Sequence, residues 1–271
     1  DGTLDPTPSF FVTAGVNDIN IKAGGELIVK AATYSGNYSA GSAQNDANSS
    51  VINYASTTVD QTIDPTETYE VLKISGSMTK SLSANTTINR DLLIQGGTLD
   101  LKTFTANRSS SGGSLTMTAL TTLKIGGTNT FPTNYSSILL ATNSLVEYYG
   151  TNQTVRALSY GNLTLSATNT ATKTMPGTAF SVAGNFTSTT SAGTLSYTAG
   201  NNITVGGNIN IGASNIFTST AFSHSFGGNW INNGTYNGCG SIVTATGTGS
   251  TWSGSGANNF GDLIISANGT I

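Results

Sequence analysis

The chain has 271 residues and a formal net charge of −3, and only 8% of its residues are charged, whereas about a quarter are charged in an ordinary soluble domain. About half of the chain is Thr, Ser, Gly and Asn, which are poor helix formers, so long α-helices are not expected. The absence of a basic excess argues against nucleic acid as a partner, and no apolar run approaches the roughly 18 residues of a membrane helix.

Short stretches of alternating apolar and polar residues follow one another along the chain, separated by Gly and Asn. Side chains two residues apart point to the same face of a strand, so each apolar pair predicts a short β-strand with one buried face. In chain order the pairs are Ile19/Ile21, Leu27/Val29, Leu99/Leu101, Leu115/Met117, Leu123/Ile125, Leu163/Leu165, Ile203/Val205 and Ile209/Ile211.

A longer block of sequence occurs three times, beginning at Val51, Leu145 and Ile242, so the starts are 94 and 97 residues apart. Lys80 and Lys173 follow the second strand of the first two copies. We therefore expect one continuous segment over 1–271, with superrepeats at about 51–144 and 145–241, a partial copy at 242–271, and 1–50 as the end of a preceding or capping unit. Because 266–271 stop in mid-pattern, we expect the segment to belong to a longer chain.

Two architectures fit a superrepeat of this kind. Tandem β-sandwich domains would require linkers and a buried Trp in each domain, yet the 5 Pro residues are scattered and no Trp precedes residue 230. Short, closely spaced strands with small residues at the corners favour an all-β parallel solenoid, or β-helix. Coils of about 22 residues would give about 12 coils and a rod about 60 Å long, with Asn and Thr stacking on like residues of neighbouring coils.

The block resembles a repeat of large secreted surface proteins of Bacteroidetes. The matching stretches are Tyr149–Val155, Tyr160–Leu165, Thr172–Met175 and Gly227–Tyr236. The third copy departs from the pattern, with Ser250-Thr-Trp252 in place of a Gln-Thr-aliphatic sequence. The resemblance implies an adhesin-like or gliding-motility-like protein of the cell surface, associated with type IX secretion. It implies no catalytic residues.

Side chains that could catalyse a reaction or bind a metal are few, because residues 174–261 contain no Asp, Glu, Lys or Arg. The only dense acidic group is Asp60, Asp64, Glu67 and Glu70, which we interpret as a solvated loop because it lacks the spacing of a calcium loop. Whether the loop Asp60–Glu70 binds calcium is left open. We expect the lone Cys239 to be a small buried hydrophobe and the lone His224 to be surface or core filler. Ser253-Gly-Ser-Gly256 is a turn and does not form a nucleophile elbow.

The sequence therefore predicts a non-enzymatic, extracellular structural or adhesive protein without catalytic, cofactor or metal sites and without a membrane span in this segment. Surface polysaccharide and other copies of the chain are the expected partners, and Tyr148, Tyr149 or Trp230 could stack on sugars if exposed, although burial in the core is the safer expectation. An ice-binding solenoid is one alternative, suggested by Thr187-Ser-Thr189 and Thr168–Thr172, although this pattern does not recur at one coil period. A polysaccharide-active β-helix enzyme is the other alternative, disfavoured by the missing carboxylates.

Overall fold

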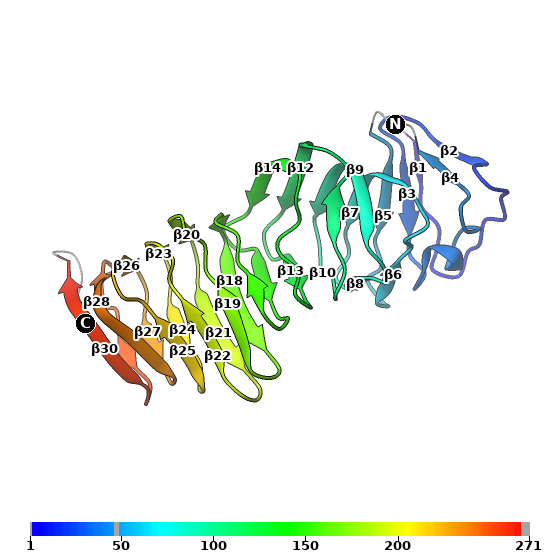
Figure 1. Ribbon diagram of the computed structural model, residues 1–271. Coiled ribbons are helices and arrows are strands. Elements are labelled where there is room, and N and C mark those ends of the chain that lie inside the picture. The colour runs from blue at the N-terminus through cyan, green and yellow to red at the C-terminus, as the bar shows by residue number, and fades with distance from the viewer. Residues whose placement is uncertain (1, 46–48, 267–271) are drawn as a thin grey trace. The chain divides into compact units, whose positions relative to one another are not determined.

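The computed structural model describes residues 2–45 and 49–266, and within them nearly every regular element is a β-strand (Figure 1). Every strand pair is parallel, and the strands stack as a β-solenoid of about 12 turns. The predicted solenoid is confirmed, and tandem immunoglobulin-like sandwiches are excluded because their sheets are antiparallel. The only helical element in the described residues is the short 3₁₀ helix η1 (Tyr34–Gly36).

Contacts within the chain group into two compact units. Unit 1 comprises 1–124 and 132–141, and unit 2 comprises 125–131 and 142–271. The main segment of unit 2 therefore begins close to the start of the second sequence copy at Leu145. That the whole chain is one continuous segment stays a prediction, and the interpretation of 266–271 as an interrupted pattern lies, apart from Ser266, outside the described residues.

Unit 1 has two principal parallel sheets and one small sheet. The first sheet has the order β1-β3-β5-β7-β9-β12-β14, with β11 also paired to β9, the second β6-β8-β10-β13, and the third β2-β4. The strands are β1 (Thr3–Leu4), β2 (Ile19–Ile21), β3 (Glu26–Val29), β4 (Ala43–Asn45), β5 (Val51–Tyr54), β6 (Gln61–Ile63), β7 (Tyr69–Ile74), β8 (Thr79–Leu82), β9 (Thr86–Ile94), β10 (Thr98–Asp100), β11 (Ala106–Arg108), β12 (Gly112–Met117), β13 (Thr122–Ile125) and β14 (Tyr135–Leu140).

Unit 2 has three walls, of order β15-β18-β21-β24-β27-β29, β16-β19-β22-β25-β28 and β17-β20-β23-β26-β28, with β30 paired to β28. The strands are β15 (Leu145–Tyr148), β16 (Gln153–Thr154), β17 (Ser159–Tyr160), β18 (Asn162–Ala167), β19 (Ala171–Thr174), β20 (Phe180–Val182), β21 (Phe186–Thr190), β22 (Leu195–Thr198), β23 (Ile203–Val205), β24 (Ile209–Ile211), β25 (Asn215–Thr218), β26 (Ser223–Phe226), β27 (Trp230–Asn232), β28 (Thr235–Ala245), β29 (Trp252–Ser253) and β30 (Ala257–Ile265).

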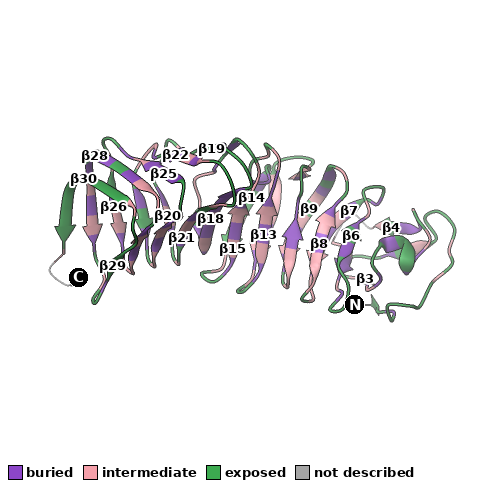
Figure 2. Cartoon of the chain, turned by 90° about the horizontal axis from the view of Figure 1, so that it is seen from below, coloured by how far each residue is buried: buried purple, intermediate pink, exposed green. Residues whose placement is uncertain are grey.

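Buried and more exposed residues alternate along the strands, as Figure 2 shows. Leu163 and Leu165 are fully buried and Thr164 between them is partly exposed, so the predicted register of this strand is confirmed. Residues paired between named strands of neighbouring coils lie from 17 positions apart, as Val146 and Leu163 do, to 25 positions apart, as Leu27 and Ile52 do, and the bridge between Thr33 and Thr62 spans 29 positions. The coils therefore have no single length.

The three sequence copies fold alike. In the three copies β5 pairs with β7, β15 with β18, and β28 with β30. Ile52 therefore lies opposite Leu72, Val146 opposite Leu163, and Val243 opposite Leu263. Leu72 and Leu163 are fully buried, but Leu263 is 42% exposed. The third copy thus repeats the pairing of the other two without a described coil over its last strand.

Asparagine side chains join successive coils of unit 2 at one corner. The Oδ1 atom of Asn162 accepts a hydrogen bond from the backbone N–H of Asn185 at 2.9 Å, Asn185 Oδ1 accepts from Asn208 N–H at 2.8 Å, and Asn208 Oδ1 accepts from Asn229 N–H at 2.6 Å. This arrangement stacks like residues of successive coils, as expected, through bonds between side chain and backbone rather than between side-chain amides. It provides backbone donors at the corners with partners that strand pairing does not supply.

Glycine occupies corner positions of unit 2 where the backbones of successive coils lie very close together. A Cβ atom at Gly247 would lie 1.7 Å from the carbonyl oxygen of Gly227, and a Cβ at Gly227 would lie 2.4 Å from that of Gly206. Both distances are shorter than any non-bonded carbon–oxygen contact allows. Small residues at the coil corners are therefore a steric requirement of the stack.

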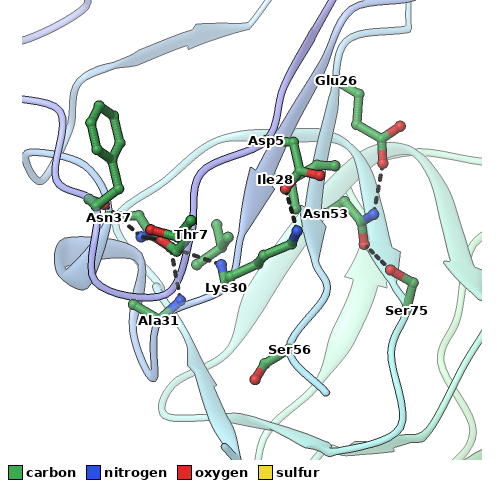
Figure 3. Close-up of polar contacts among 12 residues, drawn as sticks. Asp5, Thr7, Glu26, Ile28, Lys30, Ala31, Asn37, Asn53, Ser56 and Ser75 are labelled. Atoms are coloured by element: carbon green, nitrogen blue, oxygen red, sulfur yellow. Dashed lines mark hydrogen bonds and ion pairs between the residues drawn. The ribbon is translucent and has the colours of Figure 1, made fainter. Parts of the chain in front are cut away.

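Polar side chains hold the first coils of unit 1 together (Figure 3). Asn37 is fully buried, and its Oδ1 accepts from the backbone N–H groups of Lys30 and Ala31 at 2.7 and 2.8 Å. Asn53 bridges two neighbouring coils, because its Nδ2 donates to Glu26 Oε1 at 2.7 Å and its Oδ1 accepts from Ser75 Oγ at 2.8 Å. Side-chain amides thus serve as coil connectors in unit 1 as well.

Candidate functional site

The acidic group that the sequence singled out does not converge on one point. Asp60 Oδ1 accepts from the backbone N–H of Thr79, and Asp64 Oδ1 accepts from both the N–H and the hydroxyl of Thr66. Glu70 Oε1 accepts from an asparagine side chain on β9. No group of three or more His, Cys, Asp or Glu that could hold a metal occurs among residues 2–45 and 49–266; Asp46 lies outside them.

Glu67 corrects the interpretation of this group as a solvated loop. It is only 6% exposed, and its Oε1 accepts from the backbone N–H of Gly41 at 2.8 Å. Burial, aided by the nearby charge of Asp64, raises the pKa of Glu67 to about 6. The solvated-loop prediction is wrong for this residue, because the fold brings its carboxylate against the backbone N–H of Gly41. Gly41 lies 26 positions earlier in the chain, and the spacing of the acidic residues does not indicate this contact.

His224 lies in the core of unit 2, on β26, so core filler is the correct one of the two predicted roles. Its Nδ1 accepts from the backbone N–H of Ile203 at 3.2 Å, and its Nε2 lies 2.7 Å from Ser219 Oγ. Because Nδ1 is an acceptor, the proton of the neutral ring is on Nε2, which donates to Ser219 and cannot take its proton. Burial lowers the pKa of His224 to about 4. The pair is therefore a core hydrogen bond and does not form a nucleophile with its general base.

Cys239 is exposed, so the prediction that it is a buried hydrophobe is wrong. It lies in β28, whose pairing with β30 shifts register between Gly238 and Ile242. Gly240 adopts a φ of 85° within this irregular segment. Such a β-bulge interrupts the alternation of inward and outward side chains, and the regular alternation assumed from the sequence does not hold there.

Lys80 and Lys173 mark an internal polar corner in the first two copies. Both side chains are fully buried, and Lys173 Nζ donates to the carbonyl oxygens of Gly150 and Thr151 at 2.7 and 3.1 Å and to Gln153 Oε1 at 2.6 Å. Lys80 Nζ likewise donates to two backbone carbonyl oxygens. Burial lowers the pKa of each lysine to about 8. The sequence comparison found their equivalence but gave no sign of their burial.

The first two copies also contain one pair of buried tyrosines each, whose hydroxyls bond to the backbone of Asp64 and Arg156. The hydroxyls of Tyr54 and Tyr69 are 2.9 Å apart, and those of Tyr148 and Tyr160 are 3.2 Å apart. Desolvation raises the pKa of all four tyrosines. The four tyrosine hydroxyls therefore form hydrogen bonds inside the coils and are not available to a ligand.

The aromatic side chains proposed for sugar stacking are largely inside the protein. Tyr148 is fully buried and Trp230 is 1% exposed, whereas Tyr149 is partly exposed. Burial in the core is thus confirmed for the first two, and they offer no platform for a sugar ring. Trp230 instead stacks on Trp252, with ring centres 5.5 Å apart.

The outer faces of unit 2 carry hydroxyl side chains in columns along the coils. On the wall β16-β19-β22-β25, Thr154, Thr174, Thr198 and Thr218 lie in the same register, and the column continues with Asn237 on β28. Their inward neighbours, such as Lys173 and Tyr197, are buried. We call the outward side of this wall, residues 154, 172, 174, 196, 198, 216, 218, 235 and 237, the threonine face.

The Thr-x-Thr pattern does not recur along this wall, because the residues two before Thr198 and Thr218 are Ser196 and Ile216. Single threonines do occupy the same register on successive strands, at steps of 20, 24 and 20 residues. Turns of different length absorb the difference, so no constant period is visible in the sequence. The Thr187-Ser-Thr189 pattern named from the sequence lies on a different wall, on β21.

The wall β17-β20-β23-β26-β28 carries a second column of outward hydroxyls, which we call the serine face, with the residues Ser159, Ser181, Thr204, Ser225 and Thr244. A cavity of about 460 Å³ lies over part of this face, lined by residues that include Leu158, Ser181 and Thr204. Unit 2 therefore presents uncharged hydroxyls on two faces, of which the serine face carries a cavity.

The chain has no match to any known protein family, curated protein or solved structure. No helix in the described residues is long and apolar enough to cross a membrane. The geometry of the chain is therefore the basis for the functional proposals.

Proposed function

We propose that the chain is a segment of a non-enzymatic structural and adhesive protein, a repeat stalk or filament segment of a larger cell-surface protein. The observation that carries this proposal is the surface of unit 2, where stacked coils present uncharged hydroxyl and amide side chains in columns. Stacked coils suit a spacer, because the length of a solenoid grows with the number of its repeats.

The disposition of the reactive side chains supports a non-enzymatic role. A polysaccharide-active solenoid would place two carboxyl groups on either side of the scissile bond. Here the carboxylates of Asp60, Asp64 and Glu67 each accept separate backbone hydrogen bonds, and His224 is buried as a donor. We therefore place the polysaccharide-active enzyme second to the structural role.

Surface polysaccharide is the partner that the proposed adhesive role would take, with other copies of the chain as a further partner. Exposed hydroxyls and amides donate and accept hydrogen bonds with sugar hydroxyls without a charge requirement. The sequence resemblance to secreted Bacteroidetes surface repeats, of the adhesin, gliding-motility and type IX secretion kind, supports an extracellular location. The recurrence of the same strand pairing in three sequence copies supports a repeat protein.

Retention of the intact chain on insoluble polysaccharides tests the proposal. We expect retention without release of soluble sugar, and weaker retention for Thr187→Asp, which puts a charge on an outer face. Ser81→Asp, on an outward position of unit 1, is the matched control. Failure of every polysaccharide tested to retain the chain would contradict the adhesive role. Turnover that disappears in Asp60→Asn or Asp64→Asn would contradict the non-enzymatic role.

A further inference from the structure

The threonine face has two adjacent columns of outward side chains. Thr154, Thr174, Thr198 and Thr218 form the first column. The second column stands two residues earlier on β19, β22 and β25 and continues on β28, and its members in chain order are Thr172, Ser196, Ile216 and Thr235. None of these residues is ionisable.

The two columns define a regular grid. Neighbouring strands of a sheet lie about 4.8 Å apart, and alternate residues of one strand about 6.6 Å apart, so each side chain has neighbours at these two spacings. The four threonines of the first column make no side-chain hydrogen bond to any described residue. Their hydroxyls are therefore available to a ligand that repeats with the same two spacings.

The chemistry of the grid favours an uncharged, ordered ligand. Threonine offers one hydroxyl and one methyl group, so the face alternates hydrogen-bonding and apolar points. The residues 174–261, which supply most of it, contain no charged side chain that would hold a hydration shell of its own. Aromatic stacking, which would add to hydrogen bonding in a sugar complex, has no platform on this face, because the large exposed hydrophobic residues of unit 2 among those described are Leu263, Ile264 and Ile265, which all lie on β30.

The other two walls differ from the threonine face. The serine face has a single column, and a cavity of about 460 Å³ interrupts its surface. On the wall β15-β18-β21-β24-β27, one outward column contains Thr164, Thr187, Asn210 and Ile231, and it begins at the acidic Glu147. The adjacent column there consists of asparagines, whose amide oxygens already accept backbone hydrogen bonds from the next coil. The threonine face combines two uncharged columns with hydroxyls that such bonds do not occupy.

We propose that the threonine face binds ice, with the grid of hydroxyl and methyl groups seated on ordered water. Adsorption would involve many weak contacts repeated over the strands β16, β19, β22, β25 and β28. This inference does not rest on the adhesive function, and polysaccharide retention can fail while ice binding succeeds.

Partition of the fluorescently labelled full chain into slowly growing ice tests the proposal. The variant Thr198→Tyr places a large ring in the middle of the threonine face, and Thr204→Tyr makes the same change on the serine face. We expect the wild type and Thr204→Tyr to enter the ice, and Thr198→Tyr to be excluded to the level of an inert protein. Circular dichroism checks that each variant folds, and Thr174→Tyr replaces Thr198→Tyr if the latter does not.

Exclusion of the wild type from ice overturns the inference, as does equal partition of Thr198→Tyr and Thr204→Tyr. Polysaccharide retention is measured on the same three proteins. Loss of that retention in Thr198→Tyr, without ice binding by the wild type, also overturns the inference and assigns the face to a carbohydrate.

Discussion

Unit 1 and unit 2 stack parallel coils in the same way but hold them with different side chains. In unit 1, ion pairs join residues of different coils, as Lys73 and Glu26 do at 3.0 Å across the intervening strand β5. In unit 2, the residues 174–261 have no Asp, Glu, Lys or Arg, and aromatic rings contact one another from coil to coil, as Tyr197 and Phe217 do with ring centres 4.9 Å apart. Coil stacking therefore requires the backbone register and an apolar interior, whereas the outer and corner contacts can be charged or neutral.

The difference has consequences for how each unit responds to its surroundings. Contacts between rings such as Tyr197 and Phe217 and between amides carry no charge near neutral pH, so salt does not weaken them. Ion pairs weaken in salt, and buried titratable groups make stability depend on pH. The two units should therefore respond differently to a buried charge, to acid and to salt.

The largest effect is expected from a charge placed inside a coil of unit 2. Leu163→Asp would bury a carboxylate between Val146 and Phe186, its partners in the neighbouring strands, and should cost about 4 kcal/mol. Thr164→Asp, one residue on and outward, should change stability by less than about 0.5 kcal/mol. Hydrogen exchange should find the damage near the substituted coil, because each coil contacts only its neighbours.

The equivalent position of the third copy supplies a second control. Leu263→Asp should cost less than about 1 kcal/mol, because Leu263 is 42% exposed. Equal losses for Leu163→Asp and Leu263→Asp would show that the two leucines are in similar surroundings, and a larger loss for Thr164→Asp than for Leu163→Asp would reverse the register.

Acid should destabilise unit 2 through His224. The folded-state pKa of about 4 lies below the ordinary value of 6.5, so between these values the unfolded state binds more protons. Stability is complete above about pH 6.5 and falls by about 3 kcal/mol as the pH drops to 4. Exchange rates of the β23 and β26 amides measure the effect, and His224→Gln should remove it. An unchanged pH dependence in that variant would assign the effect to another group.

Glu67 should give unit 1 a smaller dependence of the opposite sign. Its folded-state pKa of about 6 lies above the ordinary 4.5, so the folded state binds more protons between these values. Its contribution is complete below about pH 4.5 and is lost as the pH rises through 6, by about 1 kcal/mol after solvent screening. Glu67→Gln should remove this dependence and make the N–H of Gly41 exchange more slowly at pH 7. Faster exchange there would contradict the assignment.

Salt should have the smallest effect. The ion pairs Lys30–Asp5 and Lys73–Glu26 of unit 1 are partly solvated, and each such pair contributes roughly 0.2–1 kcal/mol that high salt removes. Amide exchange in 174–261, where no charged side chain exists, should not change with salt. A salt response of that region equal to that of unit 1 would contradict the contrast between the units.

Much of the fold could be predicted from the sequence because alternation is a local property. The inward Leu163 and Leu165 follow directly from a period of two, and the threefold block made the stacked architecture visible. Stacking of Asn162, Asn185 and Asn208 also follows from sequence, since each comes just after glycine at a coil corner. These features depend on residues that are close in the chain or repeat along it.

The threonine face, the exposure of Cys239 and the burial of Glu67 depend on turn lengths and on contacts between residues far apart in the chain. The threonine face needed the register of each coil, because turns of unequal length separate Thr154, Thr174, Thr198 and Thr218. Cys239 is exposed because of the bulge in β28, and Glu67 is buried because its carboxylate lies against the backbone N–H of Gly41. Neither cause is visible in the sequence. Alternation within strands and the stacking of coils follow from local periodicity, so they can be read from the amino-acid order. Which outward side chains share a column depends on the folded register, because loops change in length without changing the pattern within strands.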